Sequence, residues 1–154
     1  MKKGFSFIEL LVTISLMGLI LGLVLVNFGG FNKAKLLSTA ADQLVVDLRL
    51  VASQAASADK PESCKSPTDL EFEGYQAEIM SATAYQISAV CDGAEYNSVT
   101  KELTNGVLFD DTVIGTFFTF YPLDDGADSV AIILRLDALT QTIQVDEAGV
   151  VYAE

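Results

Sequence analysis

One uncharged stretch constrains this chain more than any other feature. Leu10 to Phe28 contains no Asp, Glu, Lys or Arg and consists mostly of Leu, Ile, Val, Met and Gly. As a helix these 19 residues would rise about 28 Å, close to the roughly 30 Å hydrocarbon thickness of a bilayer. Lys2 and Lys3 precede the stretch, and the chain beyond it is strongly acidic. The positive-inside rule therefore predicts a single-pass membrane protein with a cytoplasmic N-terminus and an extracytoplasmic head.

A cleavable secretory signal is the first alternative for this stretch. Such signals have an apolar core of about 7–15 residues that ends in a small-residue site of the A-x-A type. The stretch here is longer, and residues 26–30 match that site poorly. An uncleaved signal anchor that holds an extracytoplasmic binding domain at the membrane is the better alternative.

One carboxylate, Glu9, directly precedes the apolar stretch. A charged side chain costs about 2.5–3.5 kcal/mol at the centre of a bilayer and less near its interface. In one interpretation Glu9 lies in the first turn of a helix, where the macrodipole favours a negative charge. In the other, the carboxylate requires a cationic partner within the membrane or within an assembly.

The residues around Glu9 follow a defined order. A short basic leader ends in Gly4, and Phe5, three further residues, Glu9 and the apolar stretch follow. This order resembles the class III signal of type IV pilins and type II secretion pseudopilins. The resemblance implies that a prepilin peptidase/N-methyltransferase cuts after Gly4 and methylates Phe5. It also implies that Phe5 and Glu9 act in assembly with other pilins or pseudopilins into a helical filament, at an inner-membrane assembly platform.

After the uncharged stretch, apolar residues recur at steps of three and four, which is typical of an amphipathic helix. Asp42, Asp47 and Arg49 are expected off this stripe. We therefore predict one helix from Phe5 to about Ala58, with residues 5–30 in the membrane and residues 31–58 amphipathic. The stripe consists of Leu37, Ala41, Leu44, Leu48, Val51 and Ala55.

Beyond Asp69 short runs rich in β-branched and aromatic residues predict strands. The predicted fold class is α+β and pilin-like, a long N-terminal helix packed against a mainly antiparallel sheet. We expect a leader at residues 1–4 and a β-rich head at residues 59–154 that forms one domain with residues 31–58. The predicted strands are Tyr75–Ile79, Ala84–Cys91, Val113–Tyr121, Val130–Leu136 and Thr140–Val145, with a closing hairpin into Val150–Tyr152.

The resemblance continues into the head in short segments. The segments are Leu44–Ala56, Gly74–Tyr75, Tyr85–Ile87, Cys91–Gly93 and Thr142–Val151, and they are similar to the H-type (FimT-like) minor pseudopilins. All three prolines follow the predicted helix, whereas many major pilins have a proline within the apolar segment. The resemblance thus implies a structural subunit without enzyme activity, a minor pseudopilin of a type II secretion system. The alternative is a minor pilin of a type IV pilus.

The net charge of the chain and its lack of histidine exclude several classes of function. It has 9 Lys+Arg against 21 Asp+Glu, a net charge of −12, and no His. Histidine-based catalysis and histidine metal sites are therefore excluded. From Pro61 onward there are 3 basic and 17 acidic residues, so we expect no binding of nucleic acid by the head.

Two further groups in the head are candidates for a bond or a ligand site. Cys64 and Cys91 are the only cysteines, and an oxidising extracytoplasmic side favours a disulfide between them, with two free buried thiols as the alternative. Three carboxylates around Gly126 form a weak calcium candidate. A solvated acidic turn is the favoured interpretation, because the other ligands of an EF-hand are absent, and no other cofactor is expected. These carboxylates belong to Asp124, Asp125 and Asp128.

Overall fold

The computed structural model describes residues 6–65, 70–123 and 125–154, apart from the side chains of residues 22–29. The chain divides into two compact units, Met1–Lys35 and Leu36–Glu154. One helix, α1 (Phe7–Ala56), contributes to both units. Unit 1 contains its first part, and unit 2 contains its second part together with the β-rich head.

Within unit 2, α1 buries the apolar stripe that the sequence predicts. All six stripe residues, from Leu37 to Ala55, are buried. The helix ends close to the predicted position, because Ala58 takes a left-handed conformation with φ 49°. The Asp59 and Ala58 N–H groups then donate to the carbonyl oxygens of Gln54 and Ala55, at 3.0 and 2.8 Å, which is a Schellman motif with alanine in place of the usual glycine.

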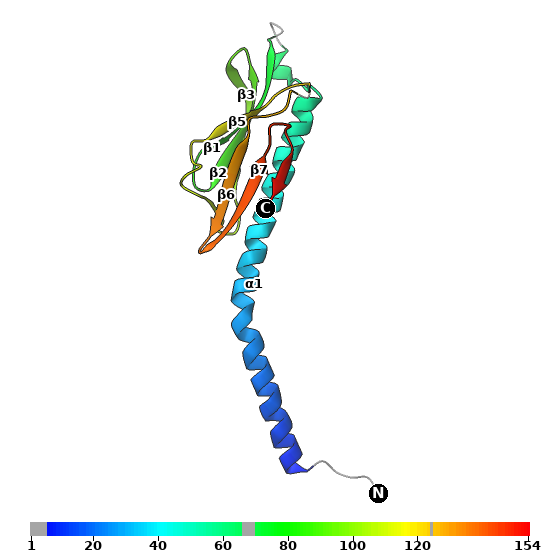
Figure 1. Cartoon of the computed structure of the whole chain (residues 1–154), viewed down its shortest axis with the longest axis vertical. Coiled ribbons are helices and arrows are strands. Elements are labelled where there is room, and N and C mark those ends of the chain that lie inside the picture. Colours follow the sequence, from blue (N-terminus) through cyan, green and yellow to red (C-terminus); the bar gives the residue numbers. More distant parts are fainter. Residues whose placement is uncertain (1–5, 66–69, 124) are drawn as a thin grey trace. The chain divides into compact units, whose positions relative to one another are not determined.

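The head consists of two antiparallel four-stranded sheets along this part of α1 (Figure 1). Sheet A has the order β3-β2-β1-β5 and sheet B the order β4-β6-β7-β8. A 3-10 turn, η1 (Glu62–Cys64), follows the helix. The strands of sheet A are β1 (Phe72–Ile79), β2 (Ala84–Cys91), β3 (Ala94–Glu102) and β5 (Phe117–Phe120). Those of sheet B are β4 (Leu108–Phe109), β6 (Val130–Leu136), β7 (Leu139–Val145) and β8 (Val151–Ala153).

The core of unit 2 lies between α1 and the inner faces of the two sheets. Buried residues alternate along much of β1, β5 and β7, as the period of two requires. The largest fully buried side chains include Phe109, Phe118, Phe120, Leu48, Ile132 and Ile143. The predicted α+β class, with a helix packed on antiparallel sheets, is confirmed.

Two strands were not predicted, and one prediction was too long. β3 is an edge strand with seven of its nine residues exposed, so it lacks the apolar alternation that identifies a strand. β4 is only two residues long. The predicted strand Val113–Tyr121 is wrong at its start, because residues 111–115 form turns and β5 begins at Phe117.

Two glycines are required by close backbone approaches. Gly74 has φ +135°, and a Cβ there would lie 2.2 Å from the Phe120 carbonyl oxygen. Gly126 has φ +84°, and a Cβ there would lie 2.0 Å from the Glu147 carbonyl oxygen. A side chain at either position would separate neighbouring segments of the head.

The half of the helix that was predicted to span the membrane, residues 5–30, belongs to unit 1. In the part of the chain that the structure describes, we find no helical segment with the length and apolarity needed to cross a bilayer. The uncharged stretch Leu10–Phe28 includes residues 22–28, whose side chains lie outside the described part.

Candidate functional site

The N-terminus of α1 contains a charged cap. Ser6 directly precedes the helix, and its N–H donates to Glu9 Oε2 at 3.1 Å. The Ser6 carbonyl oxygen accepts the first helical bond, from Leu10 N–H at 3.2 Å. A Glu that accepts from the amide of a Ser three residues earlier forms one of the two hydrogen bonds of a capping box. Glu9 is therefore placed at the positive end of the helix dipole, with its own chain supplying one hydrogen bond.

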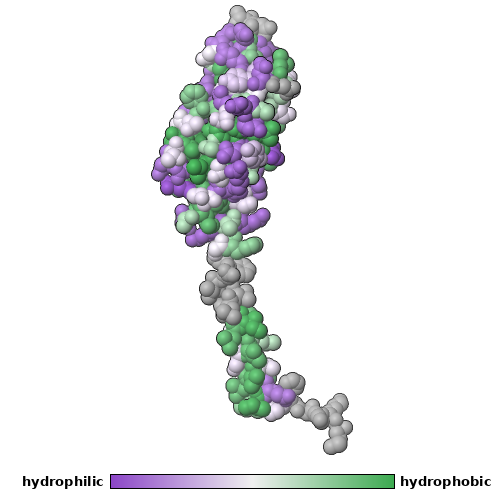
Figure 2. Space-filling model, viewed as in Figure 1, coloured by the Kyte–Doolittle hydropathy of each residue, from purple (hydrophilic) through white to green (hydrophobic). Residues whose placement is uncertain are grey.

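The residues that follow Glu9 are apolar on every side of the helix. All described side chains of residues 6–21 are exposed, among them Ile8, Leu11, Leu16 and Leu19. Figure 2 shows this part of unit 1 as almost uniformly hydrophobic. A helix that is hydrophobic all round is stable when lipid or other helices surround it.

A buried carboxylate connects α1 to sheet A. Asp47 is only 6% exposed, and its Oδ2 accepts a hydrogen bond from the Tyr85 hydroxyl at 2.6 Å. Its Oδ1 lies 2.7 Å from Lys101 Nζ and also accepts from Gln43 Nε2 at 3.3 Å. β2 and β3 are thereby joined to the helix through one side chain.

The burial of Asp47 differs from the expectation that it lies off the stripe. Asp42 and Arg49 are exposed as predicted, but the prediction for Asp47 is wrong. Asp47 follows Leu44 by three positions and precedes Val51 by four, so it lies on the same side of the helix as the stripe. In a sequence, a carboxylate at the spacing of a buried apolar stripe indicates that the carboxylate is buried and has polar partners. Its partners Tyr85 and Lys101 come from strands 38 and 54 positions further along the chain and have no local signature.

Tyr85 is the titratable group that this arrangement perturbs most. Burial raises the pKa of its hydroxyl far above the usual range, and the hydrogen bond to the Asp47 carboxylate raises it further. A phenolate beside a carboxylate would add a second negative charge in a poorly solvated position. Tyr85 is therefore a permanent hydrogen-bond donor, and its role is structural.

The two cysteines are joined. The Sγ atoms of Cys64 and Cys91 are bonded, with their Cα atoms 6.2 Å apart and both residues fully buried. The bond ties η1 to the end of β2. Nearby, the Tyr75 hydroxyl donates to the Asp59 carbonyl oxygen at 2.8 Å, so the segment after the helix is attached to sheet A at two points.

Replacing both cysteines with alanine is expected to lower the free energy of unfolding by about 3 kcal/mol, because the bond closes a loop of 27 positions and restricts the unfolded chain. Urea unfolding of the full-length chain in detergent, with and without the replacements, measures this difference. Alanine is used because a serine hydroxyl would be buried there. Complete labelling of both thiols in the native, unreduced protein would show that the bond is absent.

Asp128, one carboxylate of the weak calcium candidate, accepts hydrogen bonds from a backbone amide and a side-chain hydroxyl. Asp128 Oδ2 accepts from Thr119 N–H at 2.9 Å, and its Oδ1 accepts from the Tyr121 hydroxyl at 3.0 Å. The latter bond raises the pKa of Tyr121. Asp124 lies outside the described residues. In the part of the chain that is described, no group of three or more Asp, Glu or Cys residues has a metal-binding arrangement.

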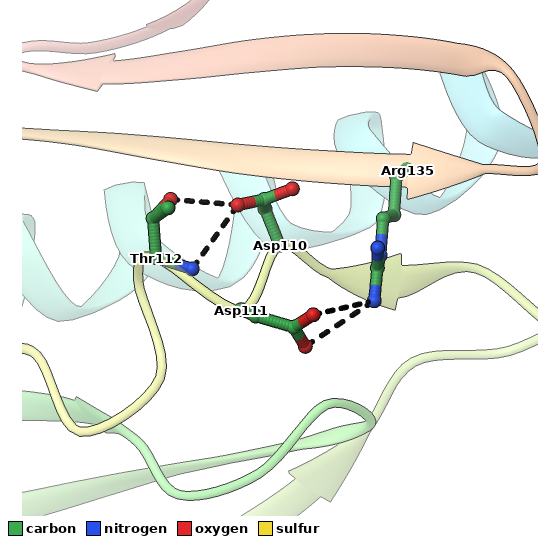
Figure 3. A network of polar contacts seen from close by, with 4 residues as sticks. All are labelled: Asp110, Asp111, Thr112 and Arg135. Atoms are coloured by element: carbon green, nitrogen blue, oxygen red, sulfur yellow. Dashed lines mark hydrogen bonds and ion pairs between the residues drawn. The ribbon is translucent and has the colours of Figure 1, made fainter.

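A second polar cluster lies at the start of the segment between β4 and β5 (Figure 3). Asp110 Oδ1 accepts from the Thr112 hydroxyl at 2.7 Å and from its N–H at 3.1 Å. These bonds lower the pKa of Asp110, and the hydroxyl bond contributes most. They also stabilise the turn that precedes β5. Beside it, both carboxylate oxygens of Asp111 face Arg135 Nη2 of β6, at 3.1 and 3.2 Å. The cluster stabilises a loop on sheet B.

Of the site residues that the sequence predicts at the N-terminus, the structure describes only Glu9. Glu9 lies at a capped helix N-terminus, whereas Gly4 and Phe5 lie outside the described residues. The described ion pairs and side-chain hydrogen bonds of Asp47, Asp111 and Asp128 join segments of unit 2 to one another.

Comparison with known proteins gives one match. Residues 1–25 match the family described as the prokaryotic N-terminal methylation motif. No curated protein and no solved structure is similar enough to this chain to count as a match. The motif supports a pilin-like subunit that is processed by prepilin peptidase and assembles with other pilins.

Proposed function

We propose that this protein is a structural subunit of a filament and that prepilin peptidase cuts its precursor between Gly4 and Phe5 and methylates Phe5. The observation that carries the proposal is the match of residues 1–25 to the methylation motif. The family with this motif is structural rather than enzymatic. The geometry of Glu9, in the first turn of an exposed apolar helix, supports an assembly role.

The proposed role of Glu9 follows from electrostatics. Cleavage would create an ammonium group on Phe5, and in an apolar environment this group and the Glu9 carboxylate are both costly without partners. At about 4 Å and an effective dielectric constant near 20, their attraction is about 4 kcal/mol before desolvation is counted. If the ammonium group of one subunit pairs with Glu9 of the next, the contact is head-to-tail and repeats along a filament.

We also propose that the N-terminal part of α1 holds the subunit in the bacterial inner membrane before assembly, with a cytoplasmic N-terminus. The uncharged sequence from Leu10 to Phe28 and the leader residues Lys2 and Lys3 support this orientation. The exposed apolar side chains of residues 10–21 support an apolar environment for unit 1. The head would then lie outside the cytoplasm, where its disulfide is stable.

The proposed system is type II secretion, with this chain as an H-type (FimT-like) minor pseudopilin. The acidic head and the lack of a proline in the apolar stretch favour this system over a type IV pilus. Deletion of the gene is expected to stop secretion of exoproteins into the medium and to leave surface pili unchanged. Loss of pili with normal secretion would instead establish the minor-pilin alternative.

Processing provides the direct test of the proposal. When the full chain is produced together with a prepilin peptidase, we expect a mature N-terminus at Phe5 that carries one added methyl group. Mass spectrometry of the N-terminal peptide measures both changes. The matched control is Gly4→Ala, which is expected to remain uncut. Wild-type chain that retains residues 1–4 under these conditions would identify it as a signal-anchored domain.

A further inference from the structure

The sheets of unit 2 have one edge that is both long and open, the edge formed by β3. At the β5 edge, Asp128 N–H donates to the Thr119 carbonyl oxygen at 3.0 Å, and Thr119 N–H donates to Asp128 Oδ2 at 2.9 Å. At the β8 edge, Arg49 Nε donates to the Val151 carbonyl oxygen at 2.8 Å. β4, at the remaining edge, is only two residues long. The outer side of β3 has no such cover among the described residues.

The open part of this edge is the second half of β3. The pairing with β2 shifts between Ile87 and Ala89, and in the bulge Asn97 takes a left-handed conformation with φ 53°. A bulge interrupts the hydrogen-bonding pattern of an edge and protects it against strand addition. The regular part that remains, residues 99–103, is about 17 Å long, which is enough to pair with a segment of about five residues.

The unpaired backbone groups follow from the ladder between β2 and β3. Leu103 N–H donates to the Thr83 carbonyl oxygen at 2.7 Å. In an antiparallel ladder every second residue bonds to the neighbouring strand, so the odd-numbered residues of this half bond to β2 and the even-numbered residues face outward. The outward N–H and C=O groups have no hydrogen-bond partner among the described residues, and they belong to Thr100 and Glu102.

The side of this edge that faces α1 is apolar and exposed. Lys101 Nζ lies 2.7 Å from Asp47 Oδ1, so the odd-numbered residues of β3 point toward the helix. Val99 is one of them and is 48% exposed. On α1, Leu50 lies on the side of Asp47 that the sheet leaves uncovered and is 56% exposed, whereas Val51 on the other side is buried. A strand added beyond β3 would place alternate side chains over Val99 and Leu50.

The other face of the edge is acidic. Glu102 is exposed and has no hydrogen-bond or ion-pair partner among the described residues. From Pro61 onward the chain has 3 basic and 17 acidic residues, so a second copy of this head would be repelled. A segment with basic side chains on this face would instead place opposite charges beside Glu102.

We propose that β3 binds an extended segment of a different subunit of the filament, which pairs as an additional strand along residues 99–103. The segment alternates apolar residues, which cover Val99 and Leu50, with basic residues, which face Glu102. Backbone hydrogen bonds supply affinity in this kind of contact, and alternate side chains supply specificity. The inference rests on the proposed role as a minor subunit, because the neighbours of such a subunit are subunits with other sequences.

Photocrosslinking in cells tests this contact. The photoreactive residue p-benzoylphenylalanine replaces Val99 in the full-length chain, which is produced together with the prepilin peptidase and the other subunits of its system. Ultraviolet light is expected to join the chain to a different subunit, and mass spectrometry of the joined peptides identifies the bound segment. The matched control carries the same probe at Thr140, an exposed position on β7 of sheet B.

A proline at the edge tests whether the contact is made by strand pairing. Thr100→Pro removes an outward N–H group and no hydrogen bond of sheet A, and proline is tolerated at such edge positions. The crosslink from the Val99 probe is expected to fall by about tenfold, because the added strand loses a backbone partner and meets the proline ring. Urea unfolding of the same variant measures whether the head keeps its stability.

Charge reversal provides a second variant that leaves the backbone unchanged. Glu102→Lys is expected to lower the crosslink by about fivefold, because like charges then meet. The matched control is Glu147→Lys, which makes the same change of charge at an exposed position between β7 and β8 and is expected to leave the yield unchanged. Equal effects of the two variants would overturn the basic character of the segment.

The outcomes separate this contact from the proposed function. A crosslink to a different subunit that both edge variants weaken supports the contact. Cleaved and incorporated chain that gives no crosslink, that is joined to a second copy or to a secreted protein, or that gives the same yield with Thr100→Pro overturns the contact and leaves the filament proposal intact. Chain that is never cleaved or incorporated overturns the filament proposal, and the contact with it.

Discussion

Glu9→Ala is expected to leave cleavage after Gly4 and membrane insertion intact and to prevent incorporation into the filament. In the proposed filament, removing the carboxylate removes the partner of the Phe5 ammonium group of the neighbouring subunit, an attraction of about 4 kcal/mol before desolvation. The Ser6 N–H also loses its acceptor, which costs about 1 kcal/mol at a helix N-terminus. The proportion of mature subunit in sheared filaments, relative to that in the membrane, measures the effect.

Glu9→Gln distinguishes the two contributions. Its amide oxygen replaces the hydrogen-bond acceptor for Ser6 N–H, but its side chain has no charge. We expect this variant to be excluded from the filament nearly as strongly as Glu9→Ala. If Glu9→Gln assembles normally and Glu9→Ala does not, the helix cap is the important contact. Normal incorporation of both variants would refute an assembly role for Glu9.

Asp47→Ala is expected to destabilise the head by about 2–4 kcal/mol. The substitution leaves the Tyr85 hydroxyl in a buried position without its acceptor, and it leaves Lys101 without its ion-pair partner. The cost stays below that of a fully buried pair, because the Lys101 side chain is 38% exposed and reaches solvent. Denaturant unfolding of the full-length chain, with the disulfide intact, measures it.

A double-mutant cycle identifies the source of this stability. Tyr85→Phe and Lys101→Met each remove one partner of Asp47, and each is expected to cost less than Asp47→Ala. In the Tyr85→Phe background the effect of Asp47→Ala is expected to fall, since the hydroxyl no longer lacks an acceptor. Effects that are strictly additive would show that Asp47 and Tyr85 stabilise the head independently. A matched surface control is Asp42→Ala, which is exposed on the same helix.

The helix and most of the sheet were predictable because their signals are local. The stripe from Leu37 to Ala55 has the period of a helix with one buried side, and each of its residues is buried in the structure. β2 and β6 were predicted with their observed bounds, since both are rich in apolar residues that favour strands and are bounded by turn residues. β3 was missed because an edge strand exposed on both faces has no apolar period.

The candidate site likewise contains local features that the sequence shows and long-range contacts that it does not show. Gly4, Phe5 and Glu9 lie close together in the sequence and are visible without a structure, and they fall within the residues 1–25 that match the methylation motif. The capping bond of Glu9 to Ser6 also follows a short sequence pattern. The contact between Asp47, Tyr85 and Lys101 joins three elements, and neither the helix nor the strands reveal it alone.

By itself the sequence determined the uncharged stretch, the acidic head, the amphipathic face of the helix and the N-terminal signal. Each of these depends on composition or on spacing within a few turns, where side-chain period and local charge decide the result. The tertiary structure alone decided that Asp47 meets Tyr85 and Lys101, that Cys64 meets Cys91, and that Phe117 and Val46 remain exposed. Those outcomes depend on strand order and register, which bring together residues that are far apart in the chain.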